Sequence, residues 1–218
     1  MNVKENYGIA LKAIWEKYPD ASSYVPMCPK DVLENSILFL GINPSVSDLT
    51  KRGEETWEMD FNTTFKESCD KPHNHYKKFY DLREVIIKTN PSIQFTYMDL
   101  LFCQETKQAN IQKLLKTDEA FILEQAKITV EIISKIKPKL VIVSNKTANQ
   151  IIHQYAKEIG FSTAPKGEVW HFNGIPIIAK ESDYMASRFM KKDEKDKYKE
   201  ILIAKIKSTL KTTENWNK

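Results

Sequence analysis

The sequence predicts a three-layer α/β/α sandwich built on a four-stranded parallel sheet. Short apolar runs alternate along the chain with segments whose apolar residues recur at helical spacing, which is typical of parallel strands joined by helical crossovers. The apolar runs are continuous rather than alternating, as expected for strands buried on both faces. A length of 218 residues suits one domain with a sizeable core. We therefore expect a single domain over 1–218, with its core over about 36–190.

The N-terminal third contributes one helix, one strand and a long loop. Apolar residues spaced three or four apart predict a helix over about Val3–Tyr18, which ends before Pro19. Ser36–Leu40 (SILFL) predicts the first core strand, ending at Gly41. Residues 42–74 follow neither a helical nor a strand period and are longer than a structureless loop in a compact domain usually is. Such a loop is typical of a functional segment.

The middle of the chain contributes two strands and two helices. Asn74 is placed to cap a helix that runs to about Lys88, and Gln94–Phe102 predicts the second strand. Thr117 or Asp118 opens a long apolar helix that Pro138 stops, and Leu140–Val143 (LVIV) predicts the third strand.

The C-terminal third predicts a helix over about Thr147–Ile159, ended by Gly160. Glu168–Asn173 and Ile175–Ala179 flank Asn173-Gly174, a pair suited to a tight hairpin turn, and Ile175–Ala179 is the fourth core strand. Lys195–Leu210 predicts the final helix.

The net charge of +4 is concentrated near the C-terminus. Residues 180–218 hold 11 Lys and Arg against 7 Asp and Glu, so this excess accounts for the whole net charge. This segment is either a phosphate-binding surface or a solvated helix face with interleaved signs. No apolar run is long enough for a signal peptide or a membrane span, so we expect a cytoplasmic protein. Cys28, Cys69 and Cys103 are expected to be reduced thiols.

Parallel sheets bind ligands at the carboxyl ends of their strands. The four predicted strands therefore nominate four segments: Gly41–Ser47, Asp99–Gln104, Ser144–Lys146 and Lys180–Arg188.

One of these segments carries a family resemblance. The stretch LFLGINPSVSD resembles the first motif of the uracil-DNA glycosylase superfamily, and Gly41-Ile42-Asn43-Pro44 resembles its mismatch-specific and thymine-DNA glycosylase branch. NHYKKFYDLREVI, YMDLLFC, the long helix with its Lys-Pro-Lys turn, and GIPIIAKESDYMASR follow in the order of the family's later landmarks. The resemblance covers about residues 36–190 and is close to literal only in the first motif. It implies a uracil-DNA glycosylase-like fold and a DNA partner.

The resemblance implies a role for each residue of the first motif. Asn43 would hold the attacking water, and the backbone near Gly41 and Ile42 would face the base. Phe61 or Phe65 would stack on the extruded base. A purely structural alternative is that Asn43 caps the next segment. For the repair function, Asn43 and Asp99 must converge on one cavity that admits a nucleobase.

The family's base-reading Asn is replaced here by Asp99. An amide donates and accepts hydrogen bonds, whereas an ionised carboxylate only accepts. We expect a preference shifted from uracil toward a base with an amino group, unless a raised pKa keeps the carboxyl protonated or the reader lies elsewhere. Asp99 could equally be a structural cap.

The last motif departs furthest from the family. Glu181-Ser182-Asp183 stands where many branches have His-Pro-Ser, so the imidazole that would stabilise the leaving base is absent. The resemblance implies DNA contacts by a set of loop residues: Ser45, Lys180, Ser182, Tyr184, Met185 and Arg188.

No cofactor and no metal are expected. Cys69, His73 and His75 have metal-binding side chains, but their spacing fits no standard zinc motif. The sequence thus favours a monomeric hydrolase that releases a damaged or mismatched base, such as uracil or another deaminated base, from DNA. Two alternatives are a catalytically silent DNA- or nucleotide-binding module of the same fold and a nucleoside hydrolase.

Overall fold

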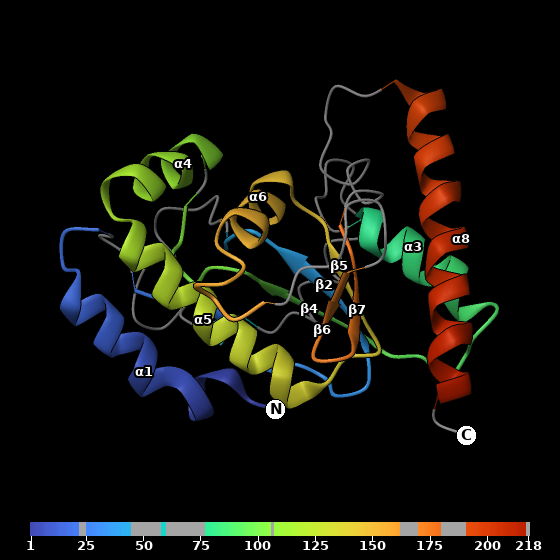
Figure 1. Cartoon of the computed structure of the whole chain (residues 1–218), viewed down its shortest axis with the longest axis horizontal. Coiled ribbons are helices and arrows are strands. Elements are labelled where there is room, and N and C mark those ends of the chain that lie inside the picture. The colour runs from blue at the N-terminus through green and yellow to red at the C-terminus, as the bar shows by residue number, and fades with distance from the viewer. Residues whose placement is uncertain are drawn as a thin grey trace.

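The computed structural model describes residues 1–21, 25–44, 58–59, 77–105, 107–161, 170–179 and 191–216. Its centre is a five-stranded sheet in the order β4-β2-β5-β7-β6 (Figure 1). The α/β class is confirmed.

The four parallel strands of this sheet end together at one edge. β4 (Phe95–Asp99), β2 (Ile37–Gly41), β5 (Leu140–Val143) and β7 (Ile175–Ile178) are mutually parallel. The chain passes from β2 to β4 on one side and later to β5 on the other. β2 therefore lies at the point where the strand order reverses, and its carboxyl end is the expected ligand position.

The predicted strand count of four was wrong by one. β6 (Trp170–Phe172) pairs antiparallel with β7 at the edge of the sheet. The predicted hairpin is present: Asn173 and Gly174 both have positive φ, at 48° and 80°, as a two-residue turn requires. A two-residue pair, β1 (Cys28–Pro29) with β3 (Glu58–Met59), forms a separate small sheet.

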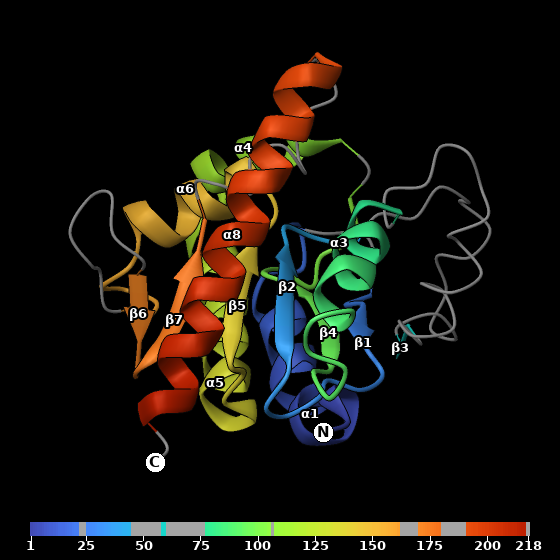
Figure 2. The ribbon, with the colours of Figure 1, turned by 90° about the vertical axis from the view of Figure 1, so that its right-hand side faces the viewer.

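Helices cover both faces of the sheet (Figure 2). α1 (Val3–Lys17), α4 (Gln108–Thr117), α5 (Glu119–Ile136) and α6 (Lys146–Gln154) join the core on one face. α3 (Lys77–Ile87) and α8 (Lys192–Trp216) join a second core on the other. Alternate strand residues divide between these cores; Leu38 and Leu40 face the first, and Ile37 and Phe39 the second.

Helix boundaries follow the predictions in part. α5 ends at Ile136, with Lys137 in the left-handed conformation at φ 43°, just before Pro138. Asp118 is its N-cap residue but makes no side-chain cap bond. α4 was not predicted, and α6 ends five residues before the expected Ile159. Asn74 lies outside the described residues.

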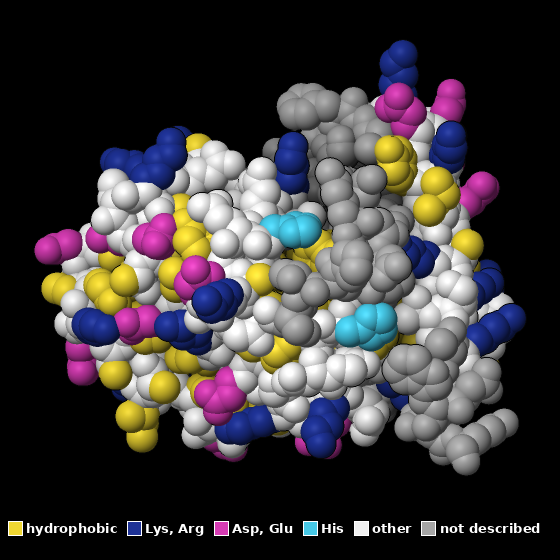
Figure 3. Space-filling model, in the orientation of Figure 1, with side chains coloured by type: hydrophobic (Ala, Val, Ile, Leu, Met, Phe, Trp, Pro, Cys, Tyr) yellow, Lys and Arg dark blue, Asp and Glu magenta, His cyan; other side chains and the backbone are white. Residues whose placement is uncertain are grey.

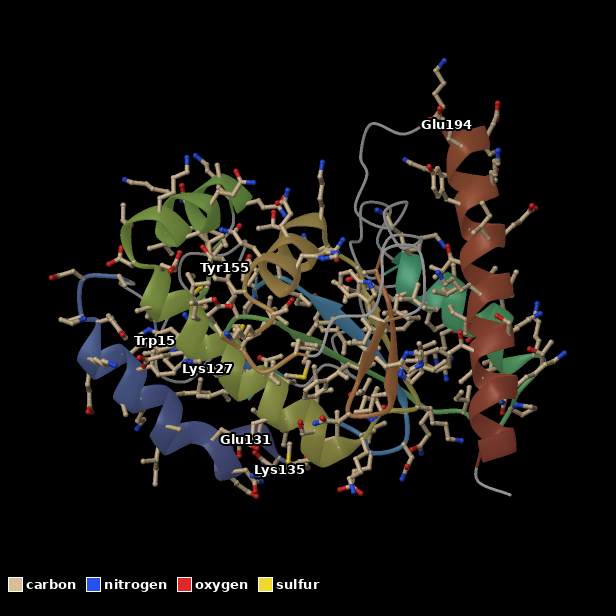
Figure 4. All side chains as sticks on the ribbon, in the orientation of Figure 1. Trp15, Lys127, Glu131, Lys135, Tyr155 and Glu194 are labelled. Carbon is tan, nitrogen blue, oxygen red and sulfur yellow. The ribbon has the colours of Figure 1, made fainter. Side chains whose placement is uncertain are left out.

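α1 packs along α5 through polar as well as apolar contacts. Tyr7 Oη donates to Glu131 at 3.1 Å, and the Lys135 ammonium lies 4.6 Å from the Tyr7 ring centroid. Figure 4 shows Glu131 and Lys135 on the part of α5 next to α1. No helix among the described segments has the length and apolarity needed to cross a bilayer.

Candidate functional site

Three of the four nominated segments meet at the carboxyl edge of the sheet: Gly41–Pro44, Asp99–Gln104 and Ser144–Lys146. β2 contributes the first, β4 the second and β5 the third. Lys180–Arg188, the fourth, lies outside the described residues, as do positions 45–47 of the first.

The loop after β2 stays paired with the loop after β4 beyond the strands themselves. Leu100 and Leu101 donate backbone hydrogen bonds to the Gly41 and Ile42 carbonyls at 3.1 and 2.9 Å. Glu105 N donates to the Pro44 carbonyl at 3.1 Å. The Gly-Ile-Asn-Pro segment is therefore held by its backbone in a defined path.

The side-chain amide of Asn43 has a fixed orientation. Its Nδ2 donates to the Glu105 carbonyl at 2.6 Å and to the Pro44 carbonyl at 3.0 Å. The reverse orientation would set the amide oxygen against two carbonyl oxygens, which repel it. Because both amide protons are used, Oδ1 is the atom of this half-buried amide through which Asn43 would bind a water.

Asp99 is a buried carboxyl at the end of β4, only 7 % exposed. Tyr97, two residues earlier on the same face of the strand, donates its hydroxyl to Asp99 Oδ1 at 2.7 Å. Burial raises the pKa of Asp99 to about 7, and the Tyr97 hydrogen bond opposes this rise. Near neutral pH, Asp99 is thus divided between a form that donates a hydrogen bond and one that only accepts.

Gly41 makes room for this pair of oxygens. It is the register partner of Asp99 on the neighbouring strand. A Cβ at position 41 would lie 2.1 Å from both Asp99 Oδ1 and Tyr97 Oη. No side chain fits there unless these groups move, so glycine is required by close approach rather than by its φ.

Asn43 and Asp99 lie at the same corner but have different hydrogen-bond partners. Asp99 and Pro44 line a hollow together with Met27, Cys28 and Phe102, and Asn43 is not among its lining residues. The hollow has a volume of about 10 Å³, which is room for about one water. The described residues therefore do not form the nucleobase-sized cavity between Asn43 and Asp99 that the sequence led us to expect.

Two buried polar side chains of α5 hold the loop after β4, and sequence reasoning missed both. Gln125 Oε1 accepts from Phe102 N and Cys103 N, each at 2.9 Å. Thr129 Oγ1 donates to the Leu100 carbonyl at 2.9 Å. Their only sequence signal is a pair of polar residues four apart on the apolar stripe of α5. Gln125 and Thr129 therefore position the loop after β4.

A second polar link ties α4 to α6. Gln108 Nε2 donates to Asn145 Oδ1 and Thr147 Oγ1, each at 2.9 Å. Asn145 is the N-cap of α6 and accepts from Thr147 N and Ala148 N at 2.8 and 3.1 Å. The first turn of α4 is thereby attached to the loop after β5.

Cys103 lies in the loop after β4 but is poorly suited to act as a nucleophile. It is buried, and burial raises the pKa of its thiol to about 12. The thiol is therefore neutral at physiological pH, and nucleophilic cysteines act as thiolates.

Several predicted site residues lie outside the described part of the chain. These are Ser45, Phe61, Phe65, Lys180, Ser182, Tyr184, Met185 and Arg188, together with Cys69, His73 and His75. Within the described residues, no group of three or more His, Cys, Asp or Glu side chains is arranged to hold a metal ion.

Comparison with known proteins adds no family to these observations. No protein-family model matches the sequence, and no curated protein matches it. The corner formed by Gly41, Asn43 and Asp99 is therefore the candidate site with chemically capable side chains.

Proposed function

We propose that this chain hydrolyses the N-glycosidic bond of a damaged or mismatched base in DNA. The observation that carries the proposal is the fixed amide of Asn43, which follows β2, together with the buried carboxyl of Asp99 at the end of the neighbouring strand β4. The resemblance of Gly41-Ile42-Asn43-Pro44 to the first motif of the uracil-DNA glycosylase superfamily supports the assignment of roles to these groups.

The reaction needs a positioned water and a partner for the departing base. The bond between the sugar C1′ and the base nitrogen breaks, its electron pair leaves with the base, the water oxygen bonds to C1′, and the proton that this water loses passes through solvent to the departing base. Asn43 Oδ1 accepts a hydrogen bond from that water and directs its lone pair at the sugar. A neutral amide does not deprotonate the water strongly, so the mechanism suits a base that leaves readily.

Asp99 gives the site a base preference that depends on pH. Below a pH of about 7 the protonated carboxyl donates to a carbonyl oxygen of the base, as uracil offers. Above that pH the carboxylate accepts from an exocyclic amino group instead. The hollow beside Asp99 measures about 10 Å³ and Asn43 does not line it. An extruded base must therefore displace the side chains that close this corner and bring Asn43 and Asp99 to one cavity, so that binding is coupled to a rearrangement.

The test is a panel of end-labelled duplexes, each carrying one lesion or mismatch, followed by alkali treatment to cut abasic sites. We expect strand cleavage for at least one lesion, and we expect Asn43→Ala to reduce it by about 100-fold or more while sparing duplex binding. Asn110→Ala on the exposed surface of α4 is the control. Asp99→Asn is expected to restore preference for uracil and to remove the dependence of base preference on pH.

Three results would contradict parts of the proposal. Duplex binding without cleavage of any lesion would make the chain a binding module. Release of bases from free nucleosides but not from DNA would make it a nucleoside hydrolase. Full activity of Asn43→Ala would remove the proposed role of Asn43.

A further inference from the structure

α8 extends beyond the sheet that it covers. Its buried residues Leu202, Ile206 and Leu210 belong to the core on the α3 side of the sheet. The preceding ten residues rise past the carboxyl ends of the strands (Figure 2), a length of about 15 Å at helical rise. Glu194, labelled in Figure 4, lies at this projecting end.

The stripe of α8 that packs on the sheet continues into the projecting part as lysine. Going back from Leu202 in steps of three or four residues gives Lys199, Lys195 and Lys192, which share a helix face with it. Burial agrees with this assignment of the helix face, because within 191–200 Lys195 and Lys199 are half-buried and the other residues are exposed. We call Lys192, Lys195 and Lys199 the lysine stripe.

Most acidic residues of the projecting part lie on its other faces. Asp193 and Glu200 fall away from the lysine stripe at helical periodicity, whereas Asp196, four residues after Lys192 and three before Lys199, lies beside it. The stripe therefore carries three lysines with one acidic neighbour. Figure 3 shows basic and acidic side chains interspersed over the face that it draws, including the upper right, where α8 projects. Among the described residues, no ion pair neutralises a lysine of the stripe.

The lysine stripe lies on the same side of the sheet as the Asp99 carboxyl. Tyr97 belongs to the core that α3 and α8 cover, and Asp99 follows it two residues later, on the same face of β4. A duplex presented to the carboxyl edge would thus meet the projecting lysines beside the candidate site.

We propose that the lysine stripe of α8 binds the phosphate backbone of duplex DNA next to the base-release site. The choice of DNA as the polyanion rests on the proposed function, whereas the choice of Lys192, Lys195 and Lys199 rests on the geometry of α8. Lysine ammonium groups bind phosphates as point charges and carry no base specificity. The stripe therefore supplies affinity and orientation for any sequence, while the corner at Asn43 and Asp99 selects the base.

The test compares two triple variants that remove the same charge, one from within the lysine stripe and one from lysines of α8 outside it. Lys192, Lys195 and Lys199 are changed to Gln in one, and Lys197, Lys207 and Lys211 in the other. Binding of a fluorescent, lesion-free duplex is measured by anisotropy over a series of KCl concentrations. We expect the stripe variant to bind about tenfold more weakly or worse and to lower the salt slope by about two to three, and the control to change neither appreciably.

Circular dichroism and thermal melting establish that both triples are folded. Equal losses in the two triples, or unchanged binding by the stripe variant, would overturn the inference. Tyr198 and Ile201, 39 % and 42 % exposed, flank the stripe, so anionic lipid vesicles and a structured RNA are run as competitors. A stripe-dependent preference for either of them over the duplex would also overturn it.

Base release from a lesion duplex is measured on the same samples. Stripe-dependent duplex binding without base release would retain this inference and reject the proposed function. Base release that responds equally to both triples would retain the function and reject the inference.

Discussion

The two faces of the sheet are built differently. On the face covered by α1, α5 and α6, the buried side chains of Gln125 and Thr129 bond to backbone atoms of the loop after β4. On the face covered by α3 and α8, an aromatic cluster of Phe39, Phe79 and Tyr97 leads to the buried carboxyl of Asp99.

The two kinds of buried polar group affect stability in opposite ways. A buried polar group that is fully hydrogen-bonded stabilises the fold, because losing it leaves its partners unsatisfied. A buried carboxyl whose pKa is raised by burial costs free energy whenever it is ionised. We infer that the polar residues of α5 hold the loop after β4 in place. Because ionisation of the buried Asp99 costs stability, we infer that this carboxyl is retained for its chemistry.

The largest effect should come from Gln125→Leu. The change leaves the backbone N–H groups of Phe102 and Cys103 buried without an acceptor, and we expect a loss of about 2–6 kcal/mol in the free energy of unfolding. Denaturant titration measures it. Gln150→Leu on the exposed surface of α6 is the matched control, with a change within about 0.5 kcal/mol. Similar values for the two variants would break the distinction between the faces.

The next effect is the pH dependence that Asp99 gives to stability. Its folded pKa of about 7 is above the ordinary 3.8, so between these values the folded state holds a proton that the unfolded state has lost. Stability from this group is fully present below about pH 4 and falls as the pH rises, by up to roughly 4 kcal/mol near pH 7. Asp99→Asn should remove that slope and stabilise the protein in mild alkali.

Chemical denaturation at several pH values measures this slope in both proteins. Asp20→Asn, at an exposed position near the end of α1, serves as the control. Parallel profiles for wild type and Asp99→Asn would show that Asp99 is not the group whose ionisation is costly.

The smallest of the three effects is expected from Gly41→Ala. The added methyl meets Asp99 Oδ1 and Tyr97 Oη at 2.1 Å, and displacing that pair is expected to cost about 1–3 kcal/mol in stability. In a chain that already carries Asp99→Ala and Tyr97→Phe, the same substitution should cost less, because both oxygen atoms are gone. A thermodynamic cycle of thermal melts measures the coupling, and strict additivity would show that the three residues do not share one space.

The sequence was sufficient to predict the sheet's parallel core. Ser36–Leu40, Gln94–Phe102 and Leu140–Val143 predict strands, and the bounds of β2, β4 and β5 lie within three residues of these runs. The turn at Asn173-Gly174 was equally clear, since two successive residues with positive φ favour this pair. These elements are specified by local sequence and do not depend on tertiary contacts for their prediction.

Other features depend on contacts that no local pattern encodes. α4 has one buried residue, Ile111, so its apolar period is weak, and its attachment is a bond from Gln108 to α6. The partners of Gln125 are backbone groups about 22 residues away, which sequence spacing does not reveal. For the site, strand order predicted that Gly41 and Asp99 would be close, but not that Asn43 would turn its amide to Glu105.

The hairpin that adds β6 has a consequence for how the sheet meets other chains. An edge strand exposes unpaired backbone groups, and a long, flat edge invites another chain to add a strand. β6 spans three residues, Trp170–Phe172, and pairs antiparallel with β7. A foreign strand docking there would find a short ladder whose register ends at a tight turn, so this border of the molecule is a poor seed for edge-to-edge aggregation.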